Sequence, residues 1–168
     1  MSVEKLNEKL LLASDTAKDP HKIIELLDKG ADVNCSDTYG LTPLMRAALF
    51  NSSAKVLKAL IDRGADVYER EPQYKSTPLQ LAANHNSSPA VISTLVAGGS
   101  DVNDVNYLGE TALIMAVNSG NVTRVISALI RSGSDVNARD YHDRSALDYA
   151  KMTRRHYVVK ILKDAGAR

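Results

Sequence analysis

Gly30-Ala-Asp-Val-Asn34 occurs, with small changes, three more times along this chain of 168 residues. The other copies are Gly64-Ala-Asp-Val-Tyr68, Gly99-Ser-Asp-Val-Asn103 and Gly133-Ser-Asp-Val-Asn137, and Gly166-Ala167 begins a fifth. Their glycines are separated by 34, 35, 34 and 33 residues. A fixed period in this range indicates an array of small stacked units, so the repeat predicts a solenoid before any local pattern is considered.

A second repeated phrase begins about twelve residues after each glycine. Its copies are Thr42-Pro-Leu-Met-Arg-Ala47, Thr77-Pro-Leu-Gln-Leu-Ala82, Thr111-Ala-Leu-Ile-Met-Ala116 and Ser145-Ala-Leu-Asp-Tyr-Ala150. These residues resemble the T-P-L-H-x-A signature of the ankyrin repeat, whose period also matches. The resemblance covers nearly the whole chain. It implies an all-α ankyrin-repeat solenoid of five stacked helix pairs joined by β-turn or hairpin fingers, with units at 1–30, 31–64, 65–99, 100–133 and 134–168.

The chain departs from the family pattern in two places. The histidine of the signature is replaced by Met45, Gln80, Ile114 and Asp148. We therefore expect the hydrogen bonds that this histidine makes between neighbouring units to be absent. One residue is also added between Tyr68 and Lys75, which leaves the register of that finger open.

Cap signals mark the first helix of each pair. Thr42 and Thr77 are each followed by proline, which predicts a capping hydroxyl and a proline at the first helical position. Small residues follow at equivalent points, where they allow close approach of neighbouring helices; they are Ala13, Ala47, Ala82, Ala116 and Ala150. Asn51 and Asn86 are expected to end their helices in the left-handed conformation.

The second helices have their own cap signals and an apolar stripe. Asp19, Ser53 and Ser88 lie at matching positions and predict helix starts. Apolar pairs one turn apart form a stripe that is buried only if neighbouring units stack on it. These pairs are Ile23/Ile24 with Leu26/Leu27, Val56/Leu57 with Leu60/Ile61, Val91/Ile92 with Leu95/Val96, Val125/Ile126 with Leu129/Ile130, and Val158/Val159 with Ile161/Leu162.

Composition limits the class of protein. A hydrophobic fraction of 44% and the unbroken repeat predict a single domain over residues 1–168, with polar faces on the first and last units acting as caps. The sequence has no apolar segment long enough to predict a membrane span. The single cysteine, Cys35, is typical of a protein in a reducing compartment. The charged N-terminus lacks the apolar core of a secretory signal. We expect a cytoplasmic monomer.

The charge balance bears on the kind of partner. A net charge of +1 argues against a nucleic-acid or membrane surface. The last eighteen residues are locally basic, and we interpret them, Arg155 included, as a solvated capping face. Contact of this end with an acidic partner or RNA is the alternative.

Two candidate chemistries, a metal site and a thiol–imidazole pair, are set aside. Asp140-Tyr-His-Asp143 offers metal ligands, but on one exposed turn with no other ligand converging on it. Cys35 could pair with His85 or His142, but these residues lie on different units, whose helices are spaced about 8–10 Å apart, beyond the reach that a nucleophile and its base require. We therefore predict no metal, no cofactor and no catalytic activity.

Three Asn-x-Ser/Thr sequences, at Asn51, Asn86 and Asn121, match the glycosylation acceptor pattern. Each falls in a loop between two helices, where asparagine and serine are needed for helix ends. We interpret them as structural rather than as glycosylation sites.

The ankyrin resemblance implies a partner-binding surface on the concave face, where fingers and first helices meet. Carried over position by position, the surface comprises Tyr39, Leu41, Leu49, Phe50, Tyr74, His85, Tyr107, Leu108, Tyr141, His142, Arg144 and Met152. Every full finger carries a tyrosine at its tip. Tyrosine is enriched in protein interfaces, whereas the stripes of the core are aliphatic. The alternative is that the finger aromatics pack against adjacent fingers and that Phe50 tucks under the loop at Asn51.

These observations favour a non-catalytic module that binds another protein. An inhibitory or regulatory subunit of an enzyme would use the same surface and differs only in its partner. The loop sequence Asn86-Ser-Ser-Pro-Ala-Val-Ile92 resembles repeats common in bacterial ankyrin proteins. This resemblance implies a further alternative, a bacterial effector that acts on host proteins.

Overall fold

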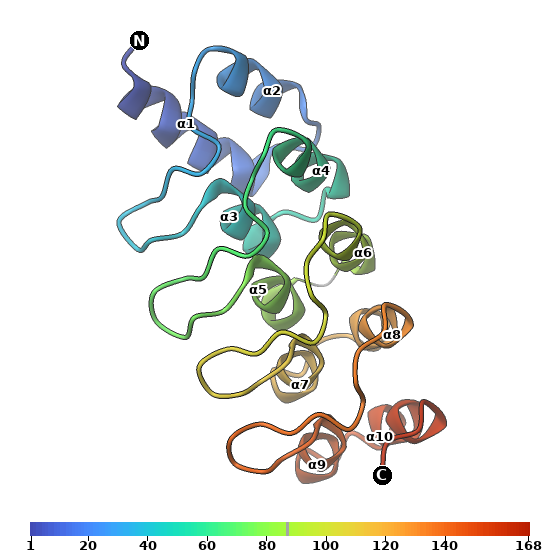
Figure 1. Cartoon of the computed structure of the whole chain (residues 1–168). Helices are drawn as coiled ribbons and strands as arrows, with labels where there is room; N and C mark the ends of the chain where they lie inside the picture. The colour runs from blue at the N-terminus through green and yellow to red at the C-terminus, as the bar shows by residue number, and fades with distance from the viewer. Residues whose placement is uncertain (87) are drawn as a thin grey trace.

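The repeat predicted from the sequence is present as a stack of helix pairs in the computed structural model, which describes residues 1–86 and 88–168. The helices in these residues are α1 (Val3–Thr16), α2 (His21–Asp28), α3 (Pro43–Phe50), α4 (Ala54–Asp62), α5 (Pro78–His85), α6 (Pro89–Ala97), α7 (Ala112–Asn118), α8 (Thr123–Arg131), α9 (Ala146–Met152) and α10 (His156–Asp164). They form five stacked pairs, which confirms the predicted all-α solenoid (Figure 1).

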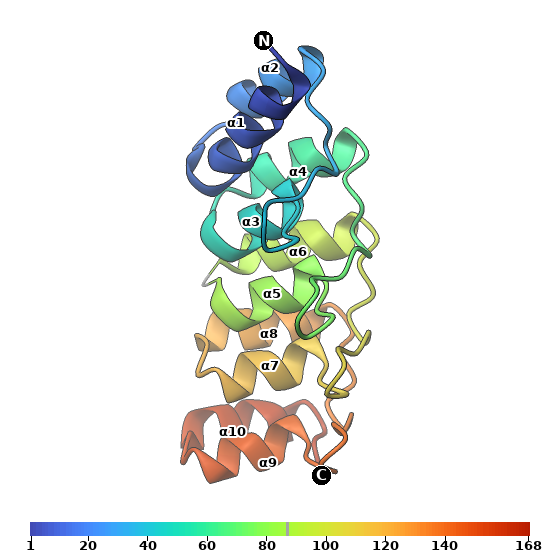
Figure 2. The ribbon, with the colours of Figure 1, turned by 90° about the vertical axis from the view of Figure 1, so that its left-hand side faces the viewer.

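The pairs stack in two rows with the chain termini at opposite ends. The first helices α1, α3, α5, α7 and α9 form one row and the second helices form the other (Figure 1). Figure 2 shows the row of first helices with the fingers along one edge. The fingers are mostly turn: in the described residues their only isolated β-bridges join Val105 to Thr111 and Arg139 to Ser145.

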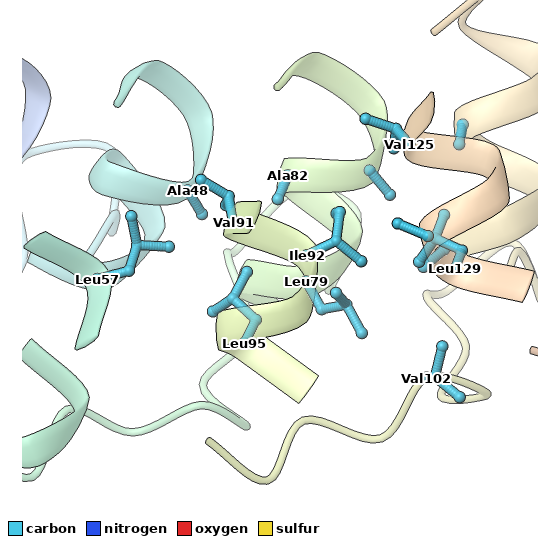
Figure 3. Packing of buried hydrophobic residues seen from close by; sticks show 14 of the residues in the cluster. Ala48, Leu57, Leu79, Ala82, Val91, Ile92, Leu95, Val102, Val125 and Leu129 are labelled. Atoms are coloured by element: carbon cyan, nitrogen blue, oxygen red, sulfur yellow. The ribbon is translucent and has the colours of Figure 1, made fainter. Parts of the chain in front are cut away.

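The core is a continuous aliphatic layer between the two rows. Leu44, Leu79 and Leu113 occupy equivalent positions in successive first helices and are fully buried. Figure 3 shows Leu79 with Ile92 and Leu129 from the second helices of two successive pairs. The predicted alanines are fully buried from Ala47 onward, and Ala13 is partly buried.

The helix starts of the first row follow the prediction. The hydroxyls of Thr42 and Thr77 accept the backbone N–H groups of Met45 and Gln80, at 3.3 and 3.5 Å. The side chain of the third helical residue in turn accepts the backbone N–H of the cap residue. Gln80 Oε1 accepts the N–H of Thr77 at 2.9 Å, and the Met45 sulfur accepts that of Thr42 at 3.5 Å.

The expectation that no bond replaces the signature histidine is wrong at Gln80. Its Nε2 donates to the carbonyl oxygens of Asp104 at 2.8 Å and Glu110 at 3.1 Å, both in the next finger. Glutamine carries a donor and an acceptor on one amide, so one end holds its own cap while the other reaches the following unit.

The prediction of left-handed helix ends at Asn51 and Asn86 is also wrong. Their φ angles are −104° and −92°, and both residues are extended. The Asn51 side-chain amide instead donates to the carbonyl oxygens of Ser14 and Ala17, at 2.9 and 2.8 Å, in the preceding unit. Asn86 makes the equivalent pair of bonds to Ala48 and Asn51.

The same bridge continues to the end of the stack. Asn121 donates to the carbonyl oxygens of Ala83 and Asn86. In the last unit Arg155 takes this role, donating to Val117 at 3.0 Å and Asn121 at 2.5 Å. Arg155 is therefore partly buried rather than a member of a solvated capping face. We call Asn51, Asn86, Asn121 and Arg155 the loop bridges.

The cap serines of the second helices also differ from the prediction. Ser53 and Ser88 lie at the N-cap position but make no side-chain capping bond. Ser53 Oγ donates to the carbonyl oxygen of Lys18 at 2.9 Å, in the preceding unit. Asp19 does accept the N–H of His21 at 2.9 Å, one residue before the N-cap Pro20.

The repeated Asp-Val-Asn phrase has a bonding role in both of its polar residues. Asp32 Oδ1 accepts the N–H of Asn34 at 2.9 Å and closes the local turn. Asn34 then donates to the carbonyl oxygen of Gly64 and accepts the N–H of Asp66 in the next unit. The third and fourth full units repeat both arrangements through Asn103 and Asn137.

Replacing Asn51 with alanine tests the loop bridges. Asn51 is 5% exposed, and its removal leaves two carbonyl oxygens and the N–H of Ser53 without this partner. Because buried polar groups without partners are costly, we expect a loss of about 2–3 kcal/mol in the free energy of unfolding, measured by urea denaturation. The exposed Asn118, replaced in the same way, should change it by less than about 0.5 kcal/mol. Equal stability of the two variants would contradict the structural role of the bridge.

Candidate functional site

The surface implied by the ankyrin resemblance is made of the finger tips and the C-terminal ends of the first helices, which are the ends away from the finger junctions. We call this surface the finger face; it comprises tip residues 37–41, 71–76, 106–110 and 140–144 and helix residues 49–50, 84–85, 118–119 and 152–153. Five of the seven exposed aromatic side chains lie on it, namely Tyr39, Phe50, Tyr74, Tyr107 and Tyr141. The surface is therefore far richer in aromatic side chains than the rest of the exterior.

Each finger tip is folded around one acceptor side chain. Asp37 Oδ1 accepts the N–H groups of Tyr39 and Leu41, at 2.8 and 2.9 Å. Asn106 and Asp140 make the equivalent pairs of bonds in the third and fourth fingers. Such acceptors hold the turn without a partner, so the tips are ordered before anything binds.

The second finger contains the added residue, and the structure gives its register. Glu71, 6% exposed, replaces the shorter acceptor and takes the N–H groups of Gln73, Tyr74 and Ser76. Lys75 has a φ of 57° and occupies the left-handed position that Gly40 holds in the first finger. The longer side chain of glutamate thus accommodates the longer turn.

The four tip tyrosines occupy two different positions. Tyr39 and Tyr74 directly precede the left-handed residue, whereas Tyr107 and Tyr141 lie two residues before it. Tyr107 packs on the preceding finger, with its ring centroid 5.8 Å from that of Tyr74. Tyr141 lies against Gly109 so closely that a Cβ on this glycine would come within 2.6 Å of its ring. Packing against the adjacent finger therefore applies to Tyr107 and Tyr141.

The two aromatic residues of the first full unit, Tyr39 and Phe50, are both exposed. Tyr39 is 78% exposed and Phe50 is 61% exposed, so Phe50 does not tuck under the loop at Asn51. The guanidinium carbon of Arg46 lies 5.9 Å from the Phe50 ring centroid. Arg46 also forms ion pairs with Asp15 and Asp37, the latter at 2.7 Å.

The carboxylate of Asp37 is held in its charged form. Burial alone would raise its pKa, but hydrogen bonds from the Leu41 amide and the Arg46 guanidinium outweigh burial, and the pKa lies below the ordinary value. The cluster of Asp15, Asp37 and Arg46 is half-buried and carries one net negative charge beside the aromatic patch.

The sequence interpretation did not include Arg46. It directly precedes Ala47, and the residues before the equivalent alanines of the other units are apolar or aromatic, namely Leu12, Leu81, Met115 and Tyr149. An alignment of the repeats would have shown that Arg46 is the one charged residue at this position. Tyr149 was also missed; its hydroxyl donates to Asp140 Oδ2 at 2.6 Å, and Arg144 lies over its ring at 5.8 Å.

The remaining predicted residues are distributed over the same face. Leu41, Leu49 and Leu108 are partly buried, whereas a second group is exposed, namely His85, His142, Arg144 and Met152. His85 accepts or donates one bond with Asn84 at 3.1 Å. Of the twelve predicted residues, nine are therefore exposed and three are partly buried.

Two residues of the constellations that were set aside, Asp140 and Cys35, are engaged or buried in the structure. Asp140 is engaged by two backbone amides and by Tyr149, and residues 1–86 and 88–168 contain no group of three metal-binding side chains. Burial and the nearby Asp32 charge raise the pKa of the Cys35 thiol to about 11, so the thiol stays protonated at neutral pH. No helix in the described part of the chain is long and apolar enough to cross a bilayer.

Two of the three possible glycosylation asparagines are buried by their structural role. Asn51 and Asn86 are each 5% exposed and use both ends of the side-chain amide in loop bridges. Asn121 is partly buried and engaged in the same way. The middle residue of the second motif, Ser87, lies outside the described residues.

The stacked helix pairs, the capped Thr-Pro-Leu starts and the fingers define the class of ankyrin-type solenoids. The family description "Ankyrin repeats (3 copies)" matches residues 10–106 and 79–168, so the chain belongs to the ankyrin repeat family. Repeats of this family are generally protein–protein interaction modules, and no catalytic domain is identified over the matched range.

Relatives with a longer architecture share part of the chain. "Ankyrin repeat, SAM and basic leucine zipper domain-containing protein 1" of Nomascus leucogenys is 38% identical to it over 74 residues. The proteins of that name from Pongo abelii and Gorilla gorilla gorilla match equally well. The matched stretch covers 44% of this chain and only 15% of each relative, so it carries the repeat and not the rest of those proteins.

The buried thiol gives a chemical test of the structure. A pKa of about 11 leaves little thiolate at pH 7.5, and burial limits access. We expect Cys35 to react with an aromatic disulfide reagent at least about tenfold more slowly in the native chain than in denaturant. The reaction is followed by absorbance, with a free thiol peptide as the reference. Equal rates in the two conditions would contradict the burial of Cys35.

The finger carboxylates make the stability of the folded chain fall at low pH. Burial would raise the pKa of Asp140, but bonds from Tyr149 and from the Arg144 and His142 amides bring it below the ordinary value of 3.8. Its contribution is therefore present above pH 3.8 and is lost as the pH falls through the lower folded value. Asp140→Asn, which copies Asn106 of the preceding finger, should narrow the difference in thermal midpoint between pH 7 and pH 3. Asp164→Asn, at an exposed site, should leave it unchanged; identical behaviour of the two variants would refute the assignment.

Proposed function

We propose that this solenoid is a non-catalytic module that holds a partner protein on its finger face. The observation that carries the proposal is the concentration of exposed aromatic side chains on one preordered surface. Aromatic rings dominate binding energy in protein interfaces, and their exposure on a monomer is otherwise unfavourable. In this proposal the whole stack of residues 1–168 acts as one binding unit.

The first full unit is the proposed centre of the interface. Tyr39 and Phe50 bury little of their area within the chain, so a partner can cover most of both rings. Asp37 and Arg46 hold the surrounding backbone and side chains, which reduces the entropy lost on binding. Partly buried Leu41 and Leu49 add apolar surface to the same unit.

The length of the face fits a standard interface. Packed helices are spaced about 8–10 Å apart, so four finger tips extend over about 30 Å. A stable interface buries roughly 800 Å² on each partner. The row from Tyr39 to Tyr141 offers an extended surface of that scale.

Alanine variants of the open aromatics test the proposal. Phe50→Ala and Tyr39→Ala should each weaken a partner captured with the native chain at least about tenfold, because central aromatic anchors contribute about 2 kcal/mol or more. The dissociation constant is measured by calorimetry. Thermal midpoints should stay within about 2 °C of the native chain, since both rings are exposed.

Tyr157→Ala is the matched control. Tyr157 is 68% exposed, but it lies on α10 in the row of second helices (Figure 1). Its replacement should leave both affinity and stability unchanged. If Phe50→Ala and Tyr39→Ala bind like the native chain while Tyr157→Ala does not, the binding surface is the outer row rather than the finger face.

A further inference from the structure

The finger face contains a cavity between the second and third fingers. Its volume is about 290 Å³, and it is lined by Tyr74, Asn84, Leu108, Glu110, Met115 and Asn118. These residues come from two finger tips and from the first helices α5 and α7, so the cavity lies across two neighbouring units. It is separate from the patch around Phe50.

Glu110 gives this cavity a negative charge without a matching cation. Its Oε2 accepts one bond from Asn106 Nδ2 at 3.0 Å, and no other side chain bonds to its carboxylate in the described residues. No ion pair to Glu110 is formed within residues 1–86 and 88–168 either. Arg144, at the same position of the next finger, lies over the Tyr149 ring instead.

The carboxylate is held in a fixed place. Asn106 is 3% exposed, and its Oδ1 accepts the N–H groups of Leu108 and Glu110, both at 2.9 Å. Its Nδ2 is therefore directed at the Glu110 carboxylate and, at 3.7 Å, at the Met115 sulfur. The turn that shapes the finger thus also positions the charge.

The other walls suit a flat, cationic group. Tyr74 lines the cavity, and its ring packs against that of Tyr107, with 5.8 Å between the ring centroids. Leu108 and buried Met115 supply apolar contact for an aliphatic stem. Asn84 and Asn118 also line the cavity, and the amide group of each contains an oxygen that can accept a hydrogen bond.

We infer that this cavity is a subsite for an arginine side chain of the bound protein. A guanidinium group stacks on aromatic rings and presents several donors in one plane, which matches a tyrosine face beside a carboxylate and two amides. A lysine ammonium has fewer donors and no planar face. The inference rests on the proposed function, since it places one residue of the partner on the finger face.

The probe is a capped single amino acid, so that no partner is required. N-acetyl-arginine methylamide is titrated into the full ¹⁵N-labelled chain at low salt, with the lysine, glutamine and glutamate analogues as parallel arms. We expect saturable shifts at the backbone amides of Asn84, Leu108, Glu110 and Asn118, with arginine binding more tightly than lysine and with no saturation for the other two probes.

Glu110→Gln removes the charge and keeps an oxygen for Asn106. It should weaken the arginine probe about fivefold, the upper range for a partly exposed ion pair, as measured by the dissociation constant. Asp143→Asn, which removes an exposed carboxylate from the next finger, should leave that constant unchanged. Correct folding of both variants is checked by their unchanged spectra away from the substituted finger.

Several results would overturn the subsite. They are shifts centred on Asp15 and Asp37, equal binding of lysine and arginine, tighter binding of the glutamate probe, or an unchanged constant in Glu110→Gln. This titration is independent of partner capture. If the arginine probe does not bind while Phe50→Ala loses the partner, only the subsite is overturned. If the probe binds while Phe50→Ala keeps the partner, only the proposed interface around Phe50 is overturned.

Discussion

The stack depends on one kind of hydrogen bond, in which a side chain of one unit donates to the loop carbonyl oxygens of the unit before it. A short helix of two turns leaves about half of its carbonyl oxygens without an intrahelical partner. In this chain the loop bridges supply donors across the unit boundary, from Asn51 at the first boundary to Arg155 at the last. Because each donor sits on the following unit, the loops are complete only when the units are stacked, which couples helix termination to assembly of the array.

Most of the fold was predictable because it depends on local signals that recur. The period, the Thr-Pro starts and the apolar stripes each act within one unit, and repetition makes them visible. The roles of Asn51 and Gln80 were not predictable in the same way. Their partners lie 24 to 37 residues away, and a cap motif at the right spacing gave a local explanation that the structure replaces with bonds between units.

The exposure of the candidate site residues was also largely predictable, but their arrangement was not. The family resemblance indicates which positions face outward, and nine of the twelve predicted residues are exposed, whereas Leu41, Leu49 and Leu108 are partly buried. Spacing alone could not distinguish the tyrosines that lean on a neighbouring finger, such as Tyr141, from those that stand free, such as Tyr39. The difference depends on the position of the tyrosine in its turn, which is one residue closer to the left-handed residue in the first two fingers than in the last two. In the second finger the added residue, which Glu71 accommodates, concealed this register.

The fingers are not equally restrained. The N–H of Tyr107 donates to the Tyr74 carbonyl oxygen at 2.9 Å, and that of Tyr141 donates to Leu108 at 3.0 Å, so the last three tips are linked in series. At the equivalent position next to the first tip the chain has Pro72, which packs on Gly40 but has no N–H to donate. The tip that carries Tyr39 therefore lacks the backbone bond that ties each later tip to its neighbour, so this turn, held internally by Asp37, can shift as a whole relative to the second finger without breaking such a bond.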